Sequence, residues 1–263
     1  MACSRETVSQ FLQHAAPLEL AENWDNVGWI LDPEDREHFE SALLTIDLTQ
    51  AVLKEALAGS VDLLIAYHPP IFSGLKRLRA SSPQERVILA AARAGLSIYS
   101  PHTALDAAPD GMTEWLARAA GPGRMKPIVE SAPGSHSGSG RQVRLDRPVT
   151  LGRAVEMVKA HLGLENLRVS EADRSEPINT VGVCPGAGGS VFEKLTRVDL
   201  LLTGEMRHHD VLAYSAAGTH VLLTEHTNSE RGYLPHLARQ MRAACPGLAV
   251  QVSAADRDPL AVG

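Results

Sequence analysis

The sequence has 263 residues, enough for one large domain or two modest ones, and its 44% hydrophobic and 21% charged residues are ordinary for a globular protein. A formal net charge of −6 and an aromatic content of 4% give no reason to expect nucleic acid as a partner. The three cysteines, Cys3, Cys184 and Cys245, form no C-x-x-C pair, which argues against a disulfide framework or a thiolate zinc finger.

The N-terminal segment lacks the apolar core of a signal peptide, and no apolar run approaches the roughly twenty residues that cross a bilayer. We therefore expect a cytoplasmic protein with no membrane partner.

Short apolar runs alternate with amphipathic stretches over residues 41–121, a pattern that predicts alternating strands and helices. Ser82 and Glu85 stand at the N-cap and capping-box positions of one helix, while Gly95 and Gly121 stand where helices should end. The predicted strands cover residues 41–48, 61–68 and 96–102, and the predicted helices cover 49–59, 83–95 and 111–121.

The amino-acid composition changes in the middle of the chain. Residues 131–141, SAPGSHSGSGR, are rich in Pro, Gly and Ser and predict a loop or linker. A strand at 141–145, a helix at 150–163 and a strand at 166–170 follow it. We interpret residues 126–176 as a linker with a small insertion.

Regular alternation returns from Asn179. Strands are predicted at 179–185, 199–205, 220–226 and 248–253, and helices at 190–198, 208–218 and 229–245. The fold class is therefore α/β with mostly parallel sheets, divided into an N-terminal half, 1–125, and a C-terminal half, 177–263. Ligands of such sheets gather at the carboxyl ends of the strands.

Imidazoles and carboxylates follow four of the predicted strands at these ends. Together they are the ligand set that suits Zn, Fe, Mn, Co or Ni. The residues are Tyr67 and His68, His102 and Asp106, Glu205 with His208 and His209, and Glu225 and His226 with Glu230.

Each residue also has an ordinary structural interpretation. His68 could simply end a strand before two prolines, and Asp106 could cap the turn in LDAAPDG. Thr227 and Glu230 match a capping box at the start of a helix, which leaves His226 unexplained.

His208 and His209 begin a predicted helix, where the helix dipole favours neutral imidazoles. They suit a substrate pocket better than direct ligation. The run from Gly186 to Ser190 could hold a phosphate on its amides, but a tight turn explains it better because no P-loop motif is present. Neither a G-x-S-x-G elbow nor a Cys-His motif is present, so metal-activated water is the chemistry that remains.

Several of these segments occur in the order typical of one family. They are Trp24-Asp25-Asn26-Val27-Gly28, YHPPIF at 67–72, PHTALDAAPDG at 101–111, TGEMRHHD at 203–210 and TEHTNSERG at 224–232. Over nearly its whole length the chain resembles the Nif-three-like family, also called GTP cyclohydrolase I type 2 homologues or dinuclear metal centre hexameric proteins.

The resemblance implies two facing α/β domains with a cleft that holds two divalent metal ions per subunit, in a ring-shaped homohexamer. His68, Asp106, His226 and Glu230 fall on the family's metal-ligand positions, with Glu230 bridging the ions. His102 falls on a family-typical histidine of the cleft, for which no direct ligation is implied.

Two departures from the family pattern matter. Many bacterial members have His-His where this chain has Tyr67-His68, and a phenol is a poorer ligand than an imidazole, which puts the second ion in doubt. The segment 126–176 is also too short for the inserted domain of some members.

The first functional hypothesis is a metal-dependent hydrolase of GTP cyclohydrolase type. It would act on a nucleotide-like substrate through metal-bound water, with Tyr67, His102, His208 and His209 as candidate cleft residues and His208 or His209 as a proton carrier. The alternative is a non-catalytic, ring-shaped interaction or regulatory platform that binds metal and a protein partner. Metal storage is a third possibility.

Overall fold

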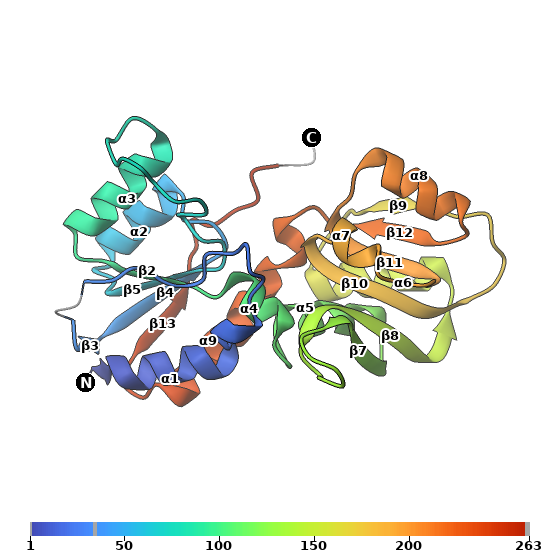
Figure 1. Ribbon diagram of the computed structural model, residues 1–263, viewed down its shortest axis with the longest axis horizontal. Coiled ribbons are helices and arrows are strands. Elements are labelled where there is room, and N and C mark those ends of the chain that lie inside the picture. The colour runs from blue at the N-terminus through green and yellow to red at the C-terminus, as the bar shows by residue number, and fades with distance from the viewer. Residues whose placement is uncertain (1, 34–35, 261–263) are drawn as a thin grey trace. The chain divides into compact units, whose positions relative to one another are not determined.

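A computed structural model describes residues 2–33 and 36–260 (Figure 1). The chain forms two compact units, the first from residues 1–105 and 234–263 and the second from 106–233. These boundaries differ from the expected divisions at 125 and 176. The difference arises because the C-terminal helix and strand return to the first unit, and a pairing between distant segments leaves no mark in local sequence.

The first unit contains a five-stranded sheet whose four-strand parallel part is closed by one antiparallel edge strand. The C-terminal strand β13 pairs in parallel with β4, so that Ala249 lies opposite Ser41. In spatial order the strands are β13 (Ala249–Val252), β4 (Ser41–Thr45), β5 (Leu63–Ala66), β6 (Ser97–Ser100) and β2 (Gly28–Leu31).

Helices lie on both faces of this sheet (Figure 1). On one face, α2 (Gln50–Ala58) and α3 (Pro83–Arg93) bury Val52, Leu53 and Val87 against strand residues such as Leu43 and Leu64. On the other face lie α1 (Arg5–Ala15) and α9 (Leu234–Ala244). The short strands β1 (Cys3–Ser4) and β3 (His38–Phe39) pair separately, and a 3-10 turn follows α1 at Leu18–Leu20.

The predicted start of α3 is confirmed. The Ser82 hydroxyl accepts a hydrogen bond from the Glu85 amide at 3.1 Å, and the Glu85 carboxylate accepts one from the Ser81 amide at 2.8 Å. At the other end of the helix Gly95 has a φ of +65°, the left-handed conformation that glycine adopts most readily.

The second unit contains a six-stranded mixed sheet. Its parallel pairs, β10 with β11 and β11 with β12, are flanked by antiparallel strands on both sides. In spatial order the strands are β7 (Gly123–Glu130), β8 (Gly138–Val149), β10 (Ile178–Ala187), β11 (Leu200–Glu205), β12 (His220–Leu223) and β9 (Arg168–Ser170). The α/β prediction is confirmed, with parallel strands in each sheet.

The middle segment is therefore part of a sheet and not a linker. Strands β7 and β8 form a hairpin, and the expected loop at 131–141 ends at Gly138, where β8 begins. Gly138 and Gly140 have φ values of +146° and +64°, and a Cβ at Gly138 would lie 2.0 Å from the Val129 carbonyl oxygen. These glycines allow β7 and β8 to approach closely. The glycine-rich composition of the segment had predicted a loop.

The helices of the second unit are α5 (Met112–Ala117) with a following 3-10 turn at Arg118–Ala120, α6 (Leu151–Leu162), α7 (Gly189–Phe192) and α8 (His208–Ala216). The predicted helix at 190–198 is shorter than expected, since α7 ends at Phe192. Phe192, Val198, Leu201, Val221 and Leu223 form a buried cluster against which Tyr214 of α8 packs. Among the described residues, no helix combines the length and hydropathy that crossing a bilayer requires.

Arg141 is the largest fully buried side chain of the second unit. Its guanidinium donates to Glu114 Oε1 at 3.1 Å and to the carbonyl oxygens of Ala107 and Ala108 at 3.3 and 3.2 Å. Two further bonds reach the carbonyls of Gly138 and Gly140. Arg141 thus ties the C-terminal end of α4 (His102–Ala107), which carries Asp106, to the sheet.

We predict that Arg141→Met lowers the free energy of unfolding by about 3 kcal/mol, because Glu114 and several carbonyls lose a buried charged partner. Urea unfolding followed by circular dichroism measures the change. Arg144→Met on the exposed side of the same strand is the matched control and should change stability by about 0.5 kcal/mol or less. Equal, small effects for both variants would contradict this role.

Candidate metal centre

His226 follows β12 in the second unit, directly after a strained residue. Glu225 has a φ of +67°, which is unusual for a residue with a side chain and turns the chain sharply at the end of the strand. His226 Nδ1 lies 3.0 Å from Glu205 Oε1, at the end of the neighbouring strand β11. This contact fixes the ring so that Nε2 faces Glu230 Oε1 at 3.4 Å.

Glu230 is a carboxylate with 1% exposure. The interpretation of Thr227 and Glu230 as a helix capping box is wrong: residues Thr227–Ser229 form a 3-10 turn, a second one follows at Arg231–Tyr233, and α9 begins at Leu234. The Thr227 hydroxyl instead accepts a hydrogen bond from the Arg231 guanidinium at 2.9 Å. Glu230 is therefore held beside His226 for a reason other than helix capping.

Two glycines allow the strand ends to close on this pair. A Cβ at Gly186 would lie 2.9 Å from both Glu230 Oε1 and His226 Nε2, and Gly186 has a φ of +58°. A Cβ at Gly204 would lie 2.8 Å from the Cα of His226. The backbone of β10 and β11 thus reaches a distance from His226 that any larger residue would prevent.

The glycine-rich turn at 186–190 forms internal contacts. The Gly186 amide donates to Ser229 Oγ at 2.8 Å, and the Gly188 amide donates to Thr203 Oγ1 at 3.1 Å. These two engaged amides support the interpretation of the motif as a tight turn.

His68 follows β5 in the first unit. Its Nδ1 lies 3.0 Å from Asp47 Oδ1, which follows the adjacent strand β4. Its ring centroid lies 5.4 Å from that of His102, in an edge-to-face arrangement. The ends of β5 and β6 therefore bring two of the predicted histidines together.

His102 also sits at strained backbone, with a φ of +26°. Its Nδ1 lies 2.8 Å from Asp25 Oδ1, and the Asp25 side chain has 0% exposure. Burial by itself would raise the pKa of Asp25, but hydrogen bonds from His102 and Thr103 outweigh burial and lower that pKa. Asp25 therefore stays ionised under an imidazole that it orients.

The same arrangement occurs three times: a carboxylate holds Nδ1 of His68, of His102 and of His226. In metal-binding histidines a partner at one ring nitrogen fixes the tautomer and presents the other nitrogen to the ion. Sequence reasoning missed the Asp25 and Asp47 partners. The available signal was position, because Asp47 lies near the carboxyl end of β4, like the other candidates at strand ends, and Asp25 lies in the WDNVG segment.

The remaining candidates differ in their surroundings. Tyr67 is 2% exposed, and its ring lies 4.9 Å from that of His68 and 5.4 Å from that of His102, so it is a packing partner of both imidazoles. Asp106 is half-buried, one turn after His102 on α4. His208 and His209 are exposed at the start of α8.

The neighbourhood of Asp106 is acidic. Burial is the main reason that the pKa of the Tyr233 phenol is raised, and the carboxylates of Asp110, Asp106 and Glu114 raise it further. The Tyr233 hydroxyl donates to the Asp110 carbonyl at 3.1 Å. Two of these carboxylates are already paired with arginines, Glu114 with Arg141 and Asp110 with Arg118.

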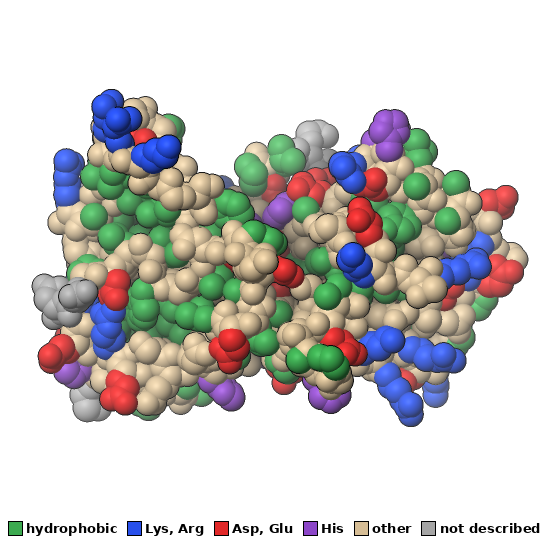
Figure 2. All heavy atoms as spheres, viewed as in Figure 1, with side chains coloured by type: hydrophobic (Ala, Val, Ile, Leu, Met, Phe, Trp, Pro, Cys, Tyr) green, Lys and Arg blue, Asp and Glu red, His purple; other side chains and the backbone are tan. Residues whose placement is uncertain are grey.

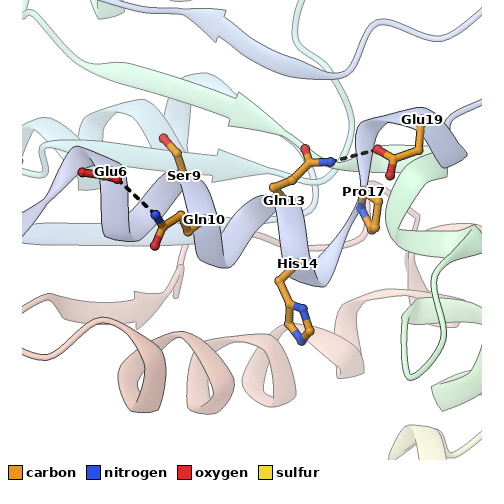
Figure 3. A pocket seen from close by; sticks show the side chains of 7 residues that line it. All are labelled: Glu6, Ser9, Gln10, Gln13, His14, Pro17 and Glu19. Atoms are coloured by element: carbon orange, nitrogen blue, oxygen red, sulfur yellow. Dashed lines mark hydrogen bonds between the residues drawn. The ribbon is translucent and has the colours of Figure 1, made fainter.

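Cavities of the described residues lie beside both histidine sets. One of about 560 Å³ is bounded by Asp47 and His68 in the first unit, and one of about 530 Å³ is bounded by Glu205, Arg207 and Asp210 in the second. A further depression on α1 contains none of the candidate residues (Figure 3). Its polar groups pair with one another, with Gln10 donating to Glu6 and Gln13 to Glu19.

We predict that Asp25→Asn lowers the free energy of unfolding at pH 7 by about 1–2 kcal/mol, through loss of charge-assisted hydrogen bonds. Because the folded pKa of Asp25 lies below the ordinary value of 3.8, its contribution is present above that value and is lost as the pH falls through the lowered pKa. Urea titrations should therefore show a gap between wild type and variant that is full at pH 7 and closes in strong acid. A gap that does not depend on pH would contradict the ionised state of Asp25.

Comparison with known proteins identifies relatives along the whole chain. The model of the Duf34/NIF3 (NGG1p interacting factor 3) family matches residues 3–259. "Protein NIF3 homolog" of Schizosaccharomyces pombe is 41% identical over 256 residues, covering 92% of this chain and 92% of that protein. "NIF3-like protein 1" of Drosophila melanogaster is 38% identical over 256 residues, covering 95% of this chain and 86% of that protein.

Solved structures share the fold at lower identity. A Bacillus cereus protein related to NIF3 has a TM-score of 0.81 at 17% identity and covers 99% of both chains. Reduced HcgD from Methanocaldococcus jannaschii has a TM-score of 0.84 at 20% identity, covering 96% of this chain and 98% of that one. With the family model matched from residue 3 to residue 259, the chain belongs to the Duf34/NIF3 family.

Proposed function

We propose that the protein binds divalent metal ions and uses them to hydrolyse a nucleotide-like substrate, in a reaction of the GTP cyclohydrolase type. The proposed ligands are His68, Asp106, His226 and Glu230. The observation that carries the proposal is the pairing of His226 with the buried Glu230 in the second unit.

The spacing of that pair fits a shared ion. His226 Nε2 and Glu230 Oε1 are 3.4 Å apart, longer than the about 2.9 Å of a common N–H···O hydrogen bond. Two ligand atoms each about 2.1 Å from a tetrahedral ion are separated by about 3.4 Å. A cation would also stabilise the Glu230 carboxylate, which has 1% exposure, because buried charges are stabilised by opposite charges and hydrogen bonds.

We propose that His68 and Asp106 complete the ligand set. A metal site normally takes three or more protein ligands, so the His226 and Glu230 pair requires further donors. His68 supports the proposal because Asp47 orients it in the way that Glu205 orients His226. His102 has the same arrangement with Asp25, and we include it as a candidate donor for a second ion, in place of the imidazole that Tyr67 does not supply.

When bound, the ion would act as a Lewis acid that holds a substrate oxygen and activates water. Mixed imidazole and carboxylate ligation suits Zn, Fe, Mn, Co or Ni alike. The chain's own contribution is to keep each imidazole in one tautomer, through Asp25, Asp47 and Glu205, and to hold the Glu230 carboxylate beside His226. The exposure of His208 and His209 lends no support to their role as proton carriers.

A second candidate is an interaction platform, with self-association into a ring-shaped hexamer and a protein partner. It is favoured by the loop at 71–81 before α3, which exposes Phe72, Leu75 and Leu78 beside Lys76, Arg77 and Arg79. Figure 2 shows positive side chains gathered over this projecting region. Relatives named for interaction with NGG1p, such as NGG1-interacting factor 3 of Saccharomyces cerevisiae, are consistent with this role.

We predict that Glu230→Gln reduces metal content per chain at least about tenfold, because the neutral amide is a poor ligand. Asp106→Ala should also lower the metal content. Elemental analysis of freshly purified protein measures the metal, and circular dichroism verifies folding. Glu176→Gln, at a carboxylate with 70% side-chain exposure, is the matched control and should keep the wild-type content.

Full metal content in both Glu230→Gln and Asp106→Ala would refute the ligand set. If the wild type itself takes up no metal after reloading with Zn, Fe, Mn, Co or Ni, the interaction platform becomes the better account. A mass in solution corresponding to six chains would then support the ring without turnover.

A further inference from the structure

We infer that the cavity beside His68 is an anion-binding subsite in which Arg257 holds a phosphate group of the substrate. The inference rests on the proposed function for the identity of the substrate as a nucleotide-like molecule. The cavity itself lies within the first unit, and its volume of about 560 Å³ falls in the range typical of small-molecule sites.

The lining of the cavity combines one candidate metal ligand with one guanidinium. His68 bounds it on the strand side, and Arg257 bounds it on the side of the C-terminal segment. Asp47 is the one carboxylate among its described lining residues, and that carboxylate is engaged by His68 Nδ1 at 3.0 Å. The other lining residues are polar or apolar and uncharged: Leu48, Thr49, Gln50, Pro69, Pro70, Pro83, Gln84, Val87, Ile88 and Pro259.

Arg257 is placed by a segment that the first unit holds firmly. The Glu55 carboxylate on α2 accepts hydrogen bonds from the amides of Ala254 and Ala255 at 2.9 and 3.1 Å and from the Ser253 hydroxyl. Asp256, 8% exposed, accepts one from the Ile46 amide at 2.8 Å, just beyond β4. The residue before Arg257 is thus fixed to the strand that leads to Asp47.

Arg257 is exposed at the edge of the cavity, and its guanidinium makes no hydrogen bond or ion pair with another described residue. Its neighbour Asp258 accepts a hydrogen bond from the Leu260 amide at 2.8 Å. The arginines that stabilise this fold are paired, as Arg36 is with Asp62 and Arg174 is with Asp199 at 2.7 Å. A guanidinium at the edge of a cavity, held in place by its backbone, has the form of a bidentate phosphate or carboxylate receptor.

Two helix starts belong to the lining of the cavity. Thr49 and Gln50 at the start of α2, and Pro83 and Gln84 at the start of α3, belong to its lining. The N-terminal ends of helices carry partial positive charge and favour anions. They strengthen the case that Arg257 and His68 make, and they fit a phosphate better than a neutral ligand.

The probe for this subsite is guanosine monophosphate, with guanosine as its partner that lacks the phosphate. Isothermal titration of the wild-type chain should show tighter binding of guanosine monophosphate than of guanosine. Arg257→Gln should weaken binding of the monophosphate at least about tenfold and leave guanosine binding unchanged, because only the phosphate contact is removed. The affinity of Arg257→Lys for guanosine monophosphate should lie between those of the wild type and Arg257→Gln, since an ammonium keeps the charge but cannot make the bidentate contact of a guanidinium.

Arg93→Gln is the matched control, because Arg93 is exposed in the last turn of α3 and lies outside the cavity lining. It should bind guanosine monophosphate like the wild type. Wild-type affinity in Arg257→Gln, or equal wild-type affinities for the monophosphate and guanosine, would overturn the inference. Circular dichroism confirms that each variant is folded.

Metal analysis of the same samples separates this inference from the proposed function. Arg257→Gln should keep the wild-type metal content, since Arg257 supplies no ligand atom to a cation. If the wild type binds no metal, and Arg257→Gln no longer prefers guanosine monophosphate to guanosine, the subsite is supported and the metal proposal is refuted. A metal-loaded chain that binds guanosine monophosphate and guanosine equally well would retain the metal proposal and overturn the phosphate subsite.

Discussion

The hydrogen bond between a carboxylate and the Nδ1 atom of a histidine is the interaction on which the candidate site depends. Asp47, Asp25 and Glu205 make it with His68, His102 and His226. A ring held in this way has a fixed tautomer and a fixed direction, so its Nε2 atom can serve as a preorganised ligand. Parallel strands make the arrangement possible, because neighbouring strands end at the same edge: Asp47 follows β4 as His68 follows β5, and Glu205 ends β11 as His226 follows β12.

The backbone around His226 adopts conformations that are unfavourable for most residues. Glu225 adopts a left-handed conformation that disfavours a residue with a side chain, and Gly186 and Gly204 occupy positions where a Cβ would collide with the site. The first unit has a counterpart in His102, whose φ is +26°. Strain of this kind persists where the surrounding structure fixes it, and it occurs here at His102 and at Glu225, the residue before His226.

Local sequence predicted much of the fold. Alternating apolar runs located β4, β5, β6, β11 and β12, and the Ser82 capping box located α3, because these features depend on neighbouring residues. The return of β13 to β4 was not predicted, since it joins segments about 200 residues apart. The glycines at the start of β8 led to the prediction of a loop, because glycine is common both in loops and where two strands approach closely.

The sequence indicated candidate residues for the site but not the hydrogen-bond partners that the structure gives their histidines. The family resemblance and the positions at strand ends selected His68, Asp106, His226 and Glu230 together. The capping-box interpretation of Glu230 followed from spacing alone and failed because the chain there forms 3-10 turns before α9. Asp25 was not predicted as a histidine partner, because it lies 77 residues from His102 in the sequence. The role of Arg257 depends on the anchoring of the C-terminal segment by Glu55 and Asp256, which no local pattern indicates.

The most direct test is X-ray anomalous scattering from crystals of the metal-loaded protein, recorded at the absorption edge of the loaded ion. We predict an anomalous peak within about 2.1–2.3 Å of both His226 Nε2 and Glu230 Oε1. Peaks found solely at surface sites, with none between His226 and Glu230, would contradict the central claim that the oriented histidines form a metal centre.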